Sequence, residues 1–118
     1  MSNAPRQLTE VAARTTAALE AIFAEEIATW RDLDPMIERP LTDLAEFVGG
    51  GGKRIRPAYC HWGFVTGGGD PTRDGARAGC CAVELLQAFA LVHDDVMDGS
   101  PTRRGTPTVW ARYIERHQ

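Results

Sequence analysis

Apolar side chains recur at steps of three and four residues along most of the chain, and this period predicts helices. The clearest run extends from Leu8 to Trp30, where the glutamates lie largely off the apolar stripe. No segment shows a convincing two-residue alternation of the kind that a strand requires. The apolar stripe of this first helix consists of Leu8, Val11, Ala12, Thr15, Leu19, Ile22, Phe23, Ile27 and Trp30. The pattern therefore predicts an all-α fold.

Prolines and glycines separate the first helix from two more. Pro40 suits the first turn of a short second helix, where the N–H that proline lacks would be unpaired anyway. The glycines of residues 49–52 predict a loop, because each glycine costs a helix about 1 kcal/mol relative to alanine. A third helix is predicted to start near Pro57 and to stop at Gly67.

A fourth helix has the clearest boundaries. Asp70 suits its N-cap, Pro71 its first position and Gly99 its C-terminal stop. Thr106 and Pro107 similarly suit the cap and first position of a last helix. Within the fourth helix we expect one face of small residues for close helix packing and a set of buried apolar residues. These are Gly75, Gly79 and Ala82 on the small face, and Val83, Leu86, Phe89, Ala90 and Val96 in the buried set.

Composition bounds the class of protein. At 118 residues the chain suits one domain, and its 43% hydrophobic and 25% charged residues are ordinary for a soluble globular protein. The net charge of −3 gives no reason to expect nucleic acid or an anionic membrane as a partner. Any anion site must therefore be a local cluster of basic residues.

Cysteine usage and hydropathy bear on the compartment. The three cysteines, Cys60, Cys80 and Cys81, include no Cys-x-x-Cys pair, which argues against a disulfide framework or a structural zinc site. No uninterrupted apolar run approaches the roughly 18 residues of a membrane span, and the first residues, Met-Ser-Asn-Ala, do not resemble a secretory signal. We expect a cytoplasmic protein without a transmembrane segment.

The most informative segment closes the fourth helix. Asp94 and Asp98 are four residues apart and share one helix face, with Asp95 beside them. Three carboxylates there repel one another, and the helix dipole disfavours each of them by about 0.3–1 kcal/mol. A hard divalent cation such as Mg²⁺ would resolve this conflict. A solvated acidic helix end remains the alternative, and we interpret His93 as a structural hydrogen-bonding residue rather than a ligand.

Basic residues form two clusters. Lys53, Arg54 and Arg56 lie between flexible glycines and a predicted helix start, a combination that favours an anion such as a diphosphate. The segment is not a nucleotide P-loop, because Phe47 and Arg54 occupy positions where that motif needs Gly and Ser or Thr. A flexible basic surface loop remains the alternative.

Arg103 and Arg104 form the second cluster and follow the acidic residues closely. They would place guanidinium groups opposite a metal-bound phosphate, unless they are simply ion-paired surface residues.

Together these segments resemble a known family. GGGGKRIRP, ELLQAFALVHDDVMD and RRG, in this order between about Leu41 and Tyr113, are similar to motifs of the trans-isoprenyl diphosphate synthases, the farnesyl and geranylgeranyl diphosphate synthase family. The resemblance implies that residues 1–118 are the N-terminal portion of one isoprenoid synthase domain, a truncated part of its helical bundle. It also implies a homodimer.

The resemblance assigns roles to the charged residues. Asp94 and Asp98, with Asp95 in support, would bind Mg²⁺ that bridges to an allylic diphosphate, and Arg103 would contact the same diphosphate. The residues that resemble the family's isopentenyl diphosphate site are Lys53, Arg56 and Arg104, together with Gln87, where many members have histidine.

The implied reaction is ionisation of the allylic diphosphate followed by head-to-tail condensation with isopentenyl diphosphate. Product length in this family is limited by bulk near the aspartates; here Phe89 is large and Ala90 small, and the resemblance favours geranylgeranyl diphosphate. The family's second aspartate-rich motif does not follow Arg104, so we expect the 118-residue chain alone to be inactive. A non-catalytic partner subunit or truncated homologue is the second hypothesis, and a generic helical metal-binding or interaction module is the third.

Overall fold

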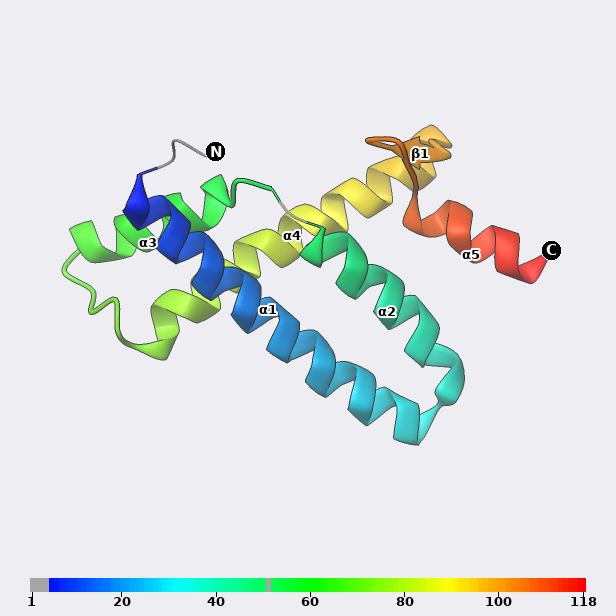
Figure 1. The fold of residues 1–118 in the computed structure, drawn as a ribbon, viewed down its shortest axis with the longest axis horizontal. Coiled ribbons are helices and arrows are strands. Elements are labelled where there is room, and N and C mark those ends of the chain that lie inside the picture. Colours follow the sequence, from blue (N-terminus) through cyan, green and yellow to red (C-terminus); the bar gives the residue numbers. More distant parts are fainter. Residues whose placement is uncertain (1–4, 51) are drawn as a thin grey trace.

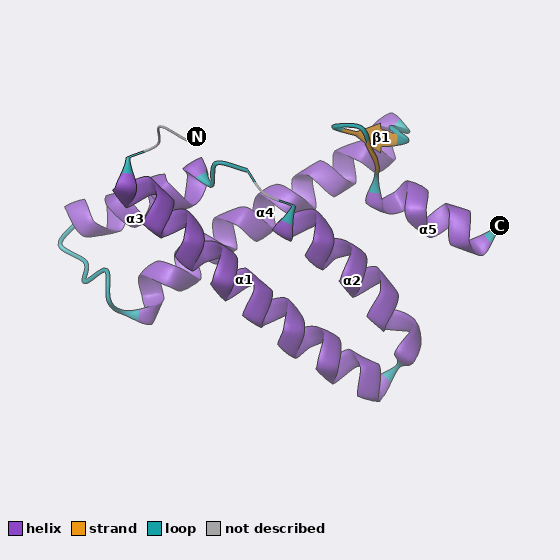
Figure 2. Cartoon of the chain, in the orientation of Figure 1, coloured by secondary structure: helices purple, strands orange, loops and turns teal. Residues whose placement is uncertain are grey.

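A computed structural model describes residues 5–50 and 52–118, so Gly51 of the predicted glycine loop and the first four residues lie outside the described part. The chain is all-α apart from one minimal hairpin, as predicted, and Figures 1 and 2 show its arrangement. The elements are α1 (Arg6–Leu33), α2 (Pro35–Gly49), α3 (Ile55–Thr66), α4 (Asp74–Asp98), β1 (Thr102–Arg103), β2 (Thr106–Pro107) and α5 (Val109–His117).

Helices α1 and α2 form an antiparallel pair joined at Asp34 (Figure 1). The carboxylate of Asp34 accepts a hydrogen bond of 3.0 Å from the backbone N–H of Met36, and Pro35 is the first residue of α2. The prediction that α2 starts at Pro40 was therefore wrong by one turn or more. Pro40 lies inside the helix, because the stronger start signal, an N-cap followed directly by proline, stands five residues earlier.

Helix α4 runs behind α1 and α2 in the view of Figure 1 and carries the hairpin at its C-terminal end. It ends as predicted at Gly99, which has a left-handed φ of 64°. Its start was predicted too early. Asp70 accepts hydrogen bonds from the backbone N–H and hydroxyl of Thr72, at 2.9 and 2.6 Å, which makes a local turn, and the helix begins only at Asp74.

The hairpin between α4 and α5 replaces the predicted start of the last helix. Thr106 and Pro107 form β2, and Thr108 is the N-cap residue of α5. The buried Thr108 hydroxyl donates to the carbonyls of the preceding loop, at 2.8 Å for Ser100, and so ties the start of α5 to the end of α4. The local Thr-Pro signal therefore did not start the helix, and Thr108 is bonded instead to a carbonyl eight residues earlier.

The core is small and lies where α1, α2 and α4 meet. Leu19, Val48 and Cys81 are its fully buried residues, one from each helix. Ala18, Phe23, Phe47, Leu85 and Ala88 pack around them. On the expected small face only Gly79 approaches a neighbour closely, since a Cβ there would lie 3.1 Å from the Cys60 sulfur, whereas one at Gly75 would meet nothing within 4 Å.

Much of α4 has no packing partner within the described residues. Leu86, Phe89, Ala90 and Val96, predicted to be buried, are exposed, with 67% of Leu86 and of Phe89 accessible. Small residues face the core instead, namely Ala76, Cys80 and Cys81.

By length and composition α4 would also suffice to cross a membrane, a test that core helices of soluble proteins pass as well. The search for uninterrupted apolar runs missed this helix. Its scattered charged residues interrupt every apolar run, but the mean hydropathy of the helix stays high.

Candidate functional site

The acidic cluster divides into two parts. Asp95 points inward and is 5% exposed at its side chain, and its two oxygens accept hydrogen bonds from Nε and Nη2 of Arg103 at 3.0 and 2.8 Å. This bidentate contact crosses from α4 to β1. The hydrogen bond to Asp95, with smaller contributions from the charges of Asp95, Asp94 and Asp98, raises the pKa of Arg103 above its ordinary value. The guanidinium therefore lies within the field of all three acids.

Asp94 and Asp98 occupy the other part. Both are exposed, they are four residues apart on α4, and neither makes an ion pair with another described residue. Their carboxylate oxygens are the ligand type that Mg²⁺ prefers. Across residues 5–50 and 52–118, no three potential metal-ligating side chains gather closely enough to form a complete site. Asp94 and Asp98 thus fit one side of a Mg²⁺ site, whereas the oxygens of Asp95 are already engaged.

His93 differs from its predicted role. It is exposed and makes no side-chain hydrogen bond within the described part of the chain; its ring stacks on Phe89 with centroids 6.0 Å apart and planes 29° apart. The residues sit four apart on one helix face, where such pairs meet. Phe89 and Ala90, the predicted chain-length residues, therefore lie on the open face of α4 beside the acids.

The basic loop before α3 contains one structural cation and two exposed ones. Arg54 is 6% exposed, with a left-handed φ of 50°. Its guanidinium donates to Glu84 on α4 at 2.6 Å, to the Val48 carbonyl at 2.8 Å and to the Thr16 hydroxyl at 3.3 Å. Lys53 and Arg56, the predicted diphosphate ligands, are both exposed on either side of it.

Sequence reasoning missed Glu84, although it decides where the basic loop lies. The side chains of Arg54 and Glu84 are only 4% and 12% exposed, and Oε1 of Glu84 is buried without a hydrogen-bond partner among the described residues. Glu84 stands ten residues before Asp94, which is about 15 Å along a helix. Gln87, partly buried, lies between them. The ion pair therefore attaches the loop with Lys53 and Arg56 to the helix that carries the acids.

Arg104 lies at the tip of the β1–β2 hairpin. Arg104 and Gly105 have φ values of 49° and 78°, and positive φ at both central positions is the signature of a type I′ turn. Arg103 and Thr106 form the pair that closes the turn. The hairpin thus separates the two arginines, because Arg103 is held at Asp95 while Arg104 is exposed.

A second ion-pair cluster, also missed from the sequence, attaches α5 to α2. Asp43 is buried and accepts from Arg116, with Nη2 to Oδ1 at 2.8 Å, and Arg112 donates to Glu46 at 2.8 Å. The hydrogen bond from Arg116 lowers the pKa of Asp43, against the opposing effect of burial. No local pattern indicated this contact, since Asp43 and Arg116 are 73 residues apart.

Comparison with known proteins finds relatives that are named as isoprenoid diphosphate synthases. The chain is 45% identical over 69 residues to a geranylgeranyl diphosphate synthase of Mycobacterium tuberculosis, an alignment that covers 58% of the chain and 19% of that protein. A short chain isoprenyl diphosphate synthase of Methanothermobacter thermautotrophicus is 44% identical over 79 residues, 66% of the chain and 23% of the relative. A (2E,6E)-farnesyl diphosphate synthase of M. tuberculosis is 48% identical over 60 residues, 51% of the chain and 16% of the relative.

The matched part thus spans less than a quarter of the length of these relatives. Residues 35–117 match the Polyprenyl synthetase family, which covers α2 to α5 and includes the acids, the basic loop and the hairpin. The chain therefore belongs to the polyprenyl synthetase family.

Proposed function

We propose that this chain is the N-terminal portion of a prenyl diphosphate synthase that condenses an allylic diphosphate with isopentenyl diphosphate, head to tail. One observation carries the proposal: Asp94 and Asp98 stand exposed on one face of α4, next to an arginine that Asp95 holds in a bidentate contact. Carboxylates for a metal and a guanidinium for a phosphate are thereby placed together at the end of one helix.

Arg103 binds the allylic diphosphate through the N–H donors that are not hydrogen-bonded to Asp95. A guanidinium has five N–H donors, and Asp95 accepts one from Nε and one from Nη2, so both N–H groups of Nη1 and the second of Nη2 remain. The contact with Asp95 also restricts the rotamers of the side chain, which reduces the ordering cost when substrate binds. Asp95 is therefore assigned to orienting Arg103, while Asp94 and Asp98 hold Mg²⁺.

Mg²⁺, when bound, would neutralise charge on the departing diphosphate. The allylic C–O bond breaks with its electron pair on the diphosphate, and Arg103 stabilises that charge. The double bond of isopentenyl diphosphate then forms the new C–C bond, and a proton leaves. Lys53, Arg56, Gln87 and Arg104 are assigned to the diphosphate of isopentenyl diphosphate, and the exposure of the three cations supports this assignment.

The product length, the compartment and the oligomeric state are proposed from the resemblance to the family. A geranylgeranyl product is favoured, because Phe89 is followed by the small Ala90 on the open face of α4, although relatives named for farnesyl diphosphate match as well. A cytoplasmic homodimer completes the proposal. The isolated 118-residue chain is proposed to be inactive, because no three potential metal ligands gather among its described residues. A non-catalytic subunit that binds diphosphate or a full-length synthase is the alternative.

The test is an Asp94→Ala variant of a longer protein that contains this sequence. Incorporation of radiolabelled isopentenyl diphosphate, with an allylic primer and Mg²⁺, should fall by at least a hundredfold, because a metal ligand is lost. Asp32→Ala removes an exposed acid at the far end of α1 and is the matched control, with turnover expected near wild type. Near-normal turnover of Asp94→Ala would overturn the metal assignment. The isolated chain should give no product in the same assay, and product from it would contradict the proposed inactivity.

A further inference from the structure

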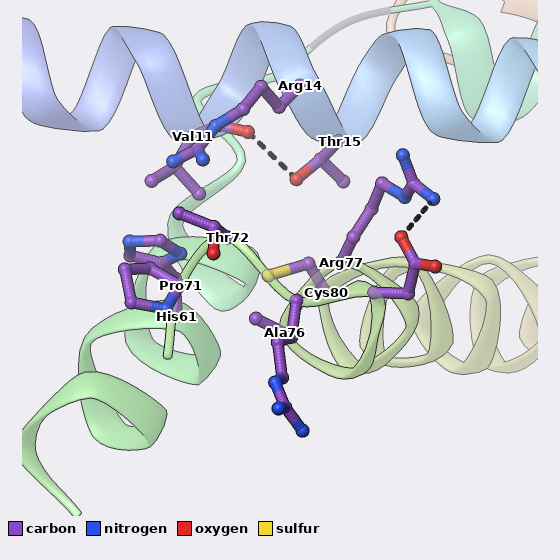
Figure 3. A pocket seen from close by; sticks show the side chains of 11 residues that line it. Val11, Arg14, Thr15, His61, Pro71, Thr72, Ala76, Arg77 and Cys80 are labelled. Atoms are coloured by element: carbon purple, nitrogen blue, oxygen red, sulfur yellow. Dashed lines mark hydrogen bonds and ion pairs between the residues drawn. The ribbon is translucent and has the colours of Figure 1, made fainter. Parts of the chain in front are cut away.

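A partly open cavity lies far from the aspartates. It has a volume of about 140 Å³ and is lined by α1, by α3, by residues 71–73 and by the start of α4 (Figure 3). This is well above the roughly 10–15 Å³ that one water requires. Asp74, at its edge, precedes Asp94 by twenty residues, or about 30 Å along α4. The cavity is therefore separate from the candidate catalytic site.

The charges around the cavity are predominantly positive. Arg14, Arg73 and Arg77 all line it, and Asp74 is the acid among the described lining residues. Asp74 is paired with Arg77 at 2.7 Å, a contact drawn in Figure 3. Neither Arg14 nor Arg73 makes an ion pair within the described part of the chain. Two unneutralised guanidinium groups therefore remain at a cavity in a protein whose net charge is negative.

A buried histidine also lines this cavity. His61 on α3 is 6% exposed, and its ring makes no hydrogen bond within the described residues. Its nearest aromatic contact is with Trp62, at 5.1 Å between centroids. Burial, together with the charge of Arg14, lowers the pKa of His61, which keeps a neutral ring with one N–H donor. Neither ring nitrogen is a fully buried, unpaired atom, since among the described residues only Oε1 of Glu84 is, so a ligand in the cavity can still reach the imidazole.

The start of α4 supplies further donors. Its N-cap residue, Arg73, makes no side-chain cap, so the backbone N–H groups of the first turn are not satisfied by a capping side chain. Such groups, with the positive end of the helix dipole, favour anions. Three features therefore point to the same kind of ligand: arginines without an ion pair, a cavity-lining imidazole without a hydrogen bond, and a helix start without a side-chain cap.

We propose that this cavity binds a phosphate group, either as a free inorganic anion or as the terminal group of a small phosphorylated molecule. Arg14 and His61 are the residues that recognise it, Arg14 through charge-assisted hydrogen bonds and His61 through its single N–H. A cation is disfavoured by the three arginines. An apolar ligand would leave the histidine and the helix donors unpaired.

The test follows the three histidine rings of the purified chain by NMR during titration with inorganic phosphate, at constant ionic strength set with chloride. The His61 signals should shift and saturate, while those of the exposed His93 and His117 should not. Parallel titrations with inorganic diphosphate and with isopentenyl diphosphate show whether the bound phosphate is a free anion or part of a larger molecule. Tighter binding of isopentenyl diphosphate at His61 would assign the site to a prenyl headgroup, and equal or weaker binding would assign it to the free anion.

Arg14→Gln should weaken phosphate binding about tenfold, because one charged hydrogen-bond partner is lost while the side-chain stem is kept. Arg6→Gln on the same helix, which removes an exposed contact with Glu10, is the matched control and should bind as the wild type does. Unchanged circular dichroism in both variants excludes unfolding as the cause. The proposal fails if His61 does not respond to any of the three anions, or if Arg14→Gln binds phosphate as tightly as the wild type. Neither result bears on Asp94, so this proposal and the prenyltransferase proposal can fail separately.

Discussion

The three acids at the end of α4 do not share one environment, although they lie within five residues of sequence. Asp95 is buried against Arg103, whereas Asp94 and Asp98 are exposed. The repulsion expected among three carboxylates is thus relieved in part by one guanidinium before any metal binds. In the proposed site, two carboxylates remain for the metal, and one orients the arginine.

Glu84 is the residue for which we predict the largest effect on stability. Its partner Arg54 is buried, so Glu84→Ala leaves an uncompensated charge inside the protein and should lower the free energy of unfolding by about 3–5 kcal/mol. Urea unfolding followed by circular dichroism measures this. Glu10→Ala, which breaks the exposed pair with Arg6, is the control and should have a much smaller effect. Similar losses in the two variants would contradict the role assigned to the buried pair.

At the scale of elements, ion pairs attach the last part of the chain in addition to the partly buried Val109, Trp110 and Ala111. Helix α5 contains no fully buried residue, and it is held to α2 through Asp43 with Arg116 and through Glu46 with Arg112. The hairpin is held to α4 in the same way, through Asp95 and Arg103. The C-terminal elements should therefore depend on pH and salt more than the α1–α2–α4 core does.

The pKa of Asp43 determines the direction in which stability changes with pH. The pKa of Asp43 is lower in the folded state than in the unfolded chain, so its contribution to stability is present above the unfolded value near 4 and is lost as the pH falls toward the folded value. Asp43→Asn should lower stability at pH 7 and flatten the loss of stability below about pH 4. Urea unfolding across this range measures both effects. Asp32→Asn, at an exposed position, should keep the wild-type profile, and an unchanged profile in Asp43→Asn would refute the assignment.

At the scale of the whole molecule, the arrangement is open. The radius of gyration is 16.0 Å, whereas a compact chain of this length has about 13.5 Å. Large apolar residues of α4 are exposed, among them Leu86, Phe89 and Met97. Their spacing places these residues on one helix face, and an exposed apolar face of this kind marks a place where other structure packs. This agrees with an alignment that covers less than a quarter of each relative.

We expect the isolated chain to bind a hydrophobic dye and to self-associate through α4. Leu86→Ser with Met97→Ser should reduce both properties while changing stability by no more than about 0.5 kcal/mol per site, because both residues are largely exposed. Dye fluorescence and light scattering measure the first effect, and urea unfolding the second. Leu19→Ser, in the core, is the contrasting control and should destabilise strongly. Dye binding that persists in the double variant would place the apolar surface elsewhere.

The sequence by itself determined what depends on neighbours within one or two helical turns. The period of apolar residues indicated the helices, Gly99 indicated the end of α4, and the spacing of Asp94 and Asp98 placed both on one face. The resemblance of three ordered motifs indicated the family, which the match over residues 35–117 confirmed.

Only the tertiary structure decided which charged residues are structural and which are exposed. Arg54 and Lys53 are adjacent and equally basic, yet one is buried because Glu84, thirty residues away, faces it, while the other is exposed. In the same way Thr108, rather than Thr106, is the residue before α5, and its hydroxyl is turned to the Ser100 carbonyl of the loop after α4 instead of capping the helix. Short-range patterns carry no information about such partners, since desolvation and ion pairing depend on which elements pack together.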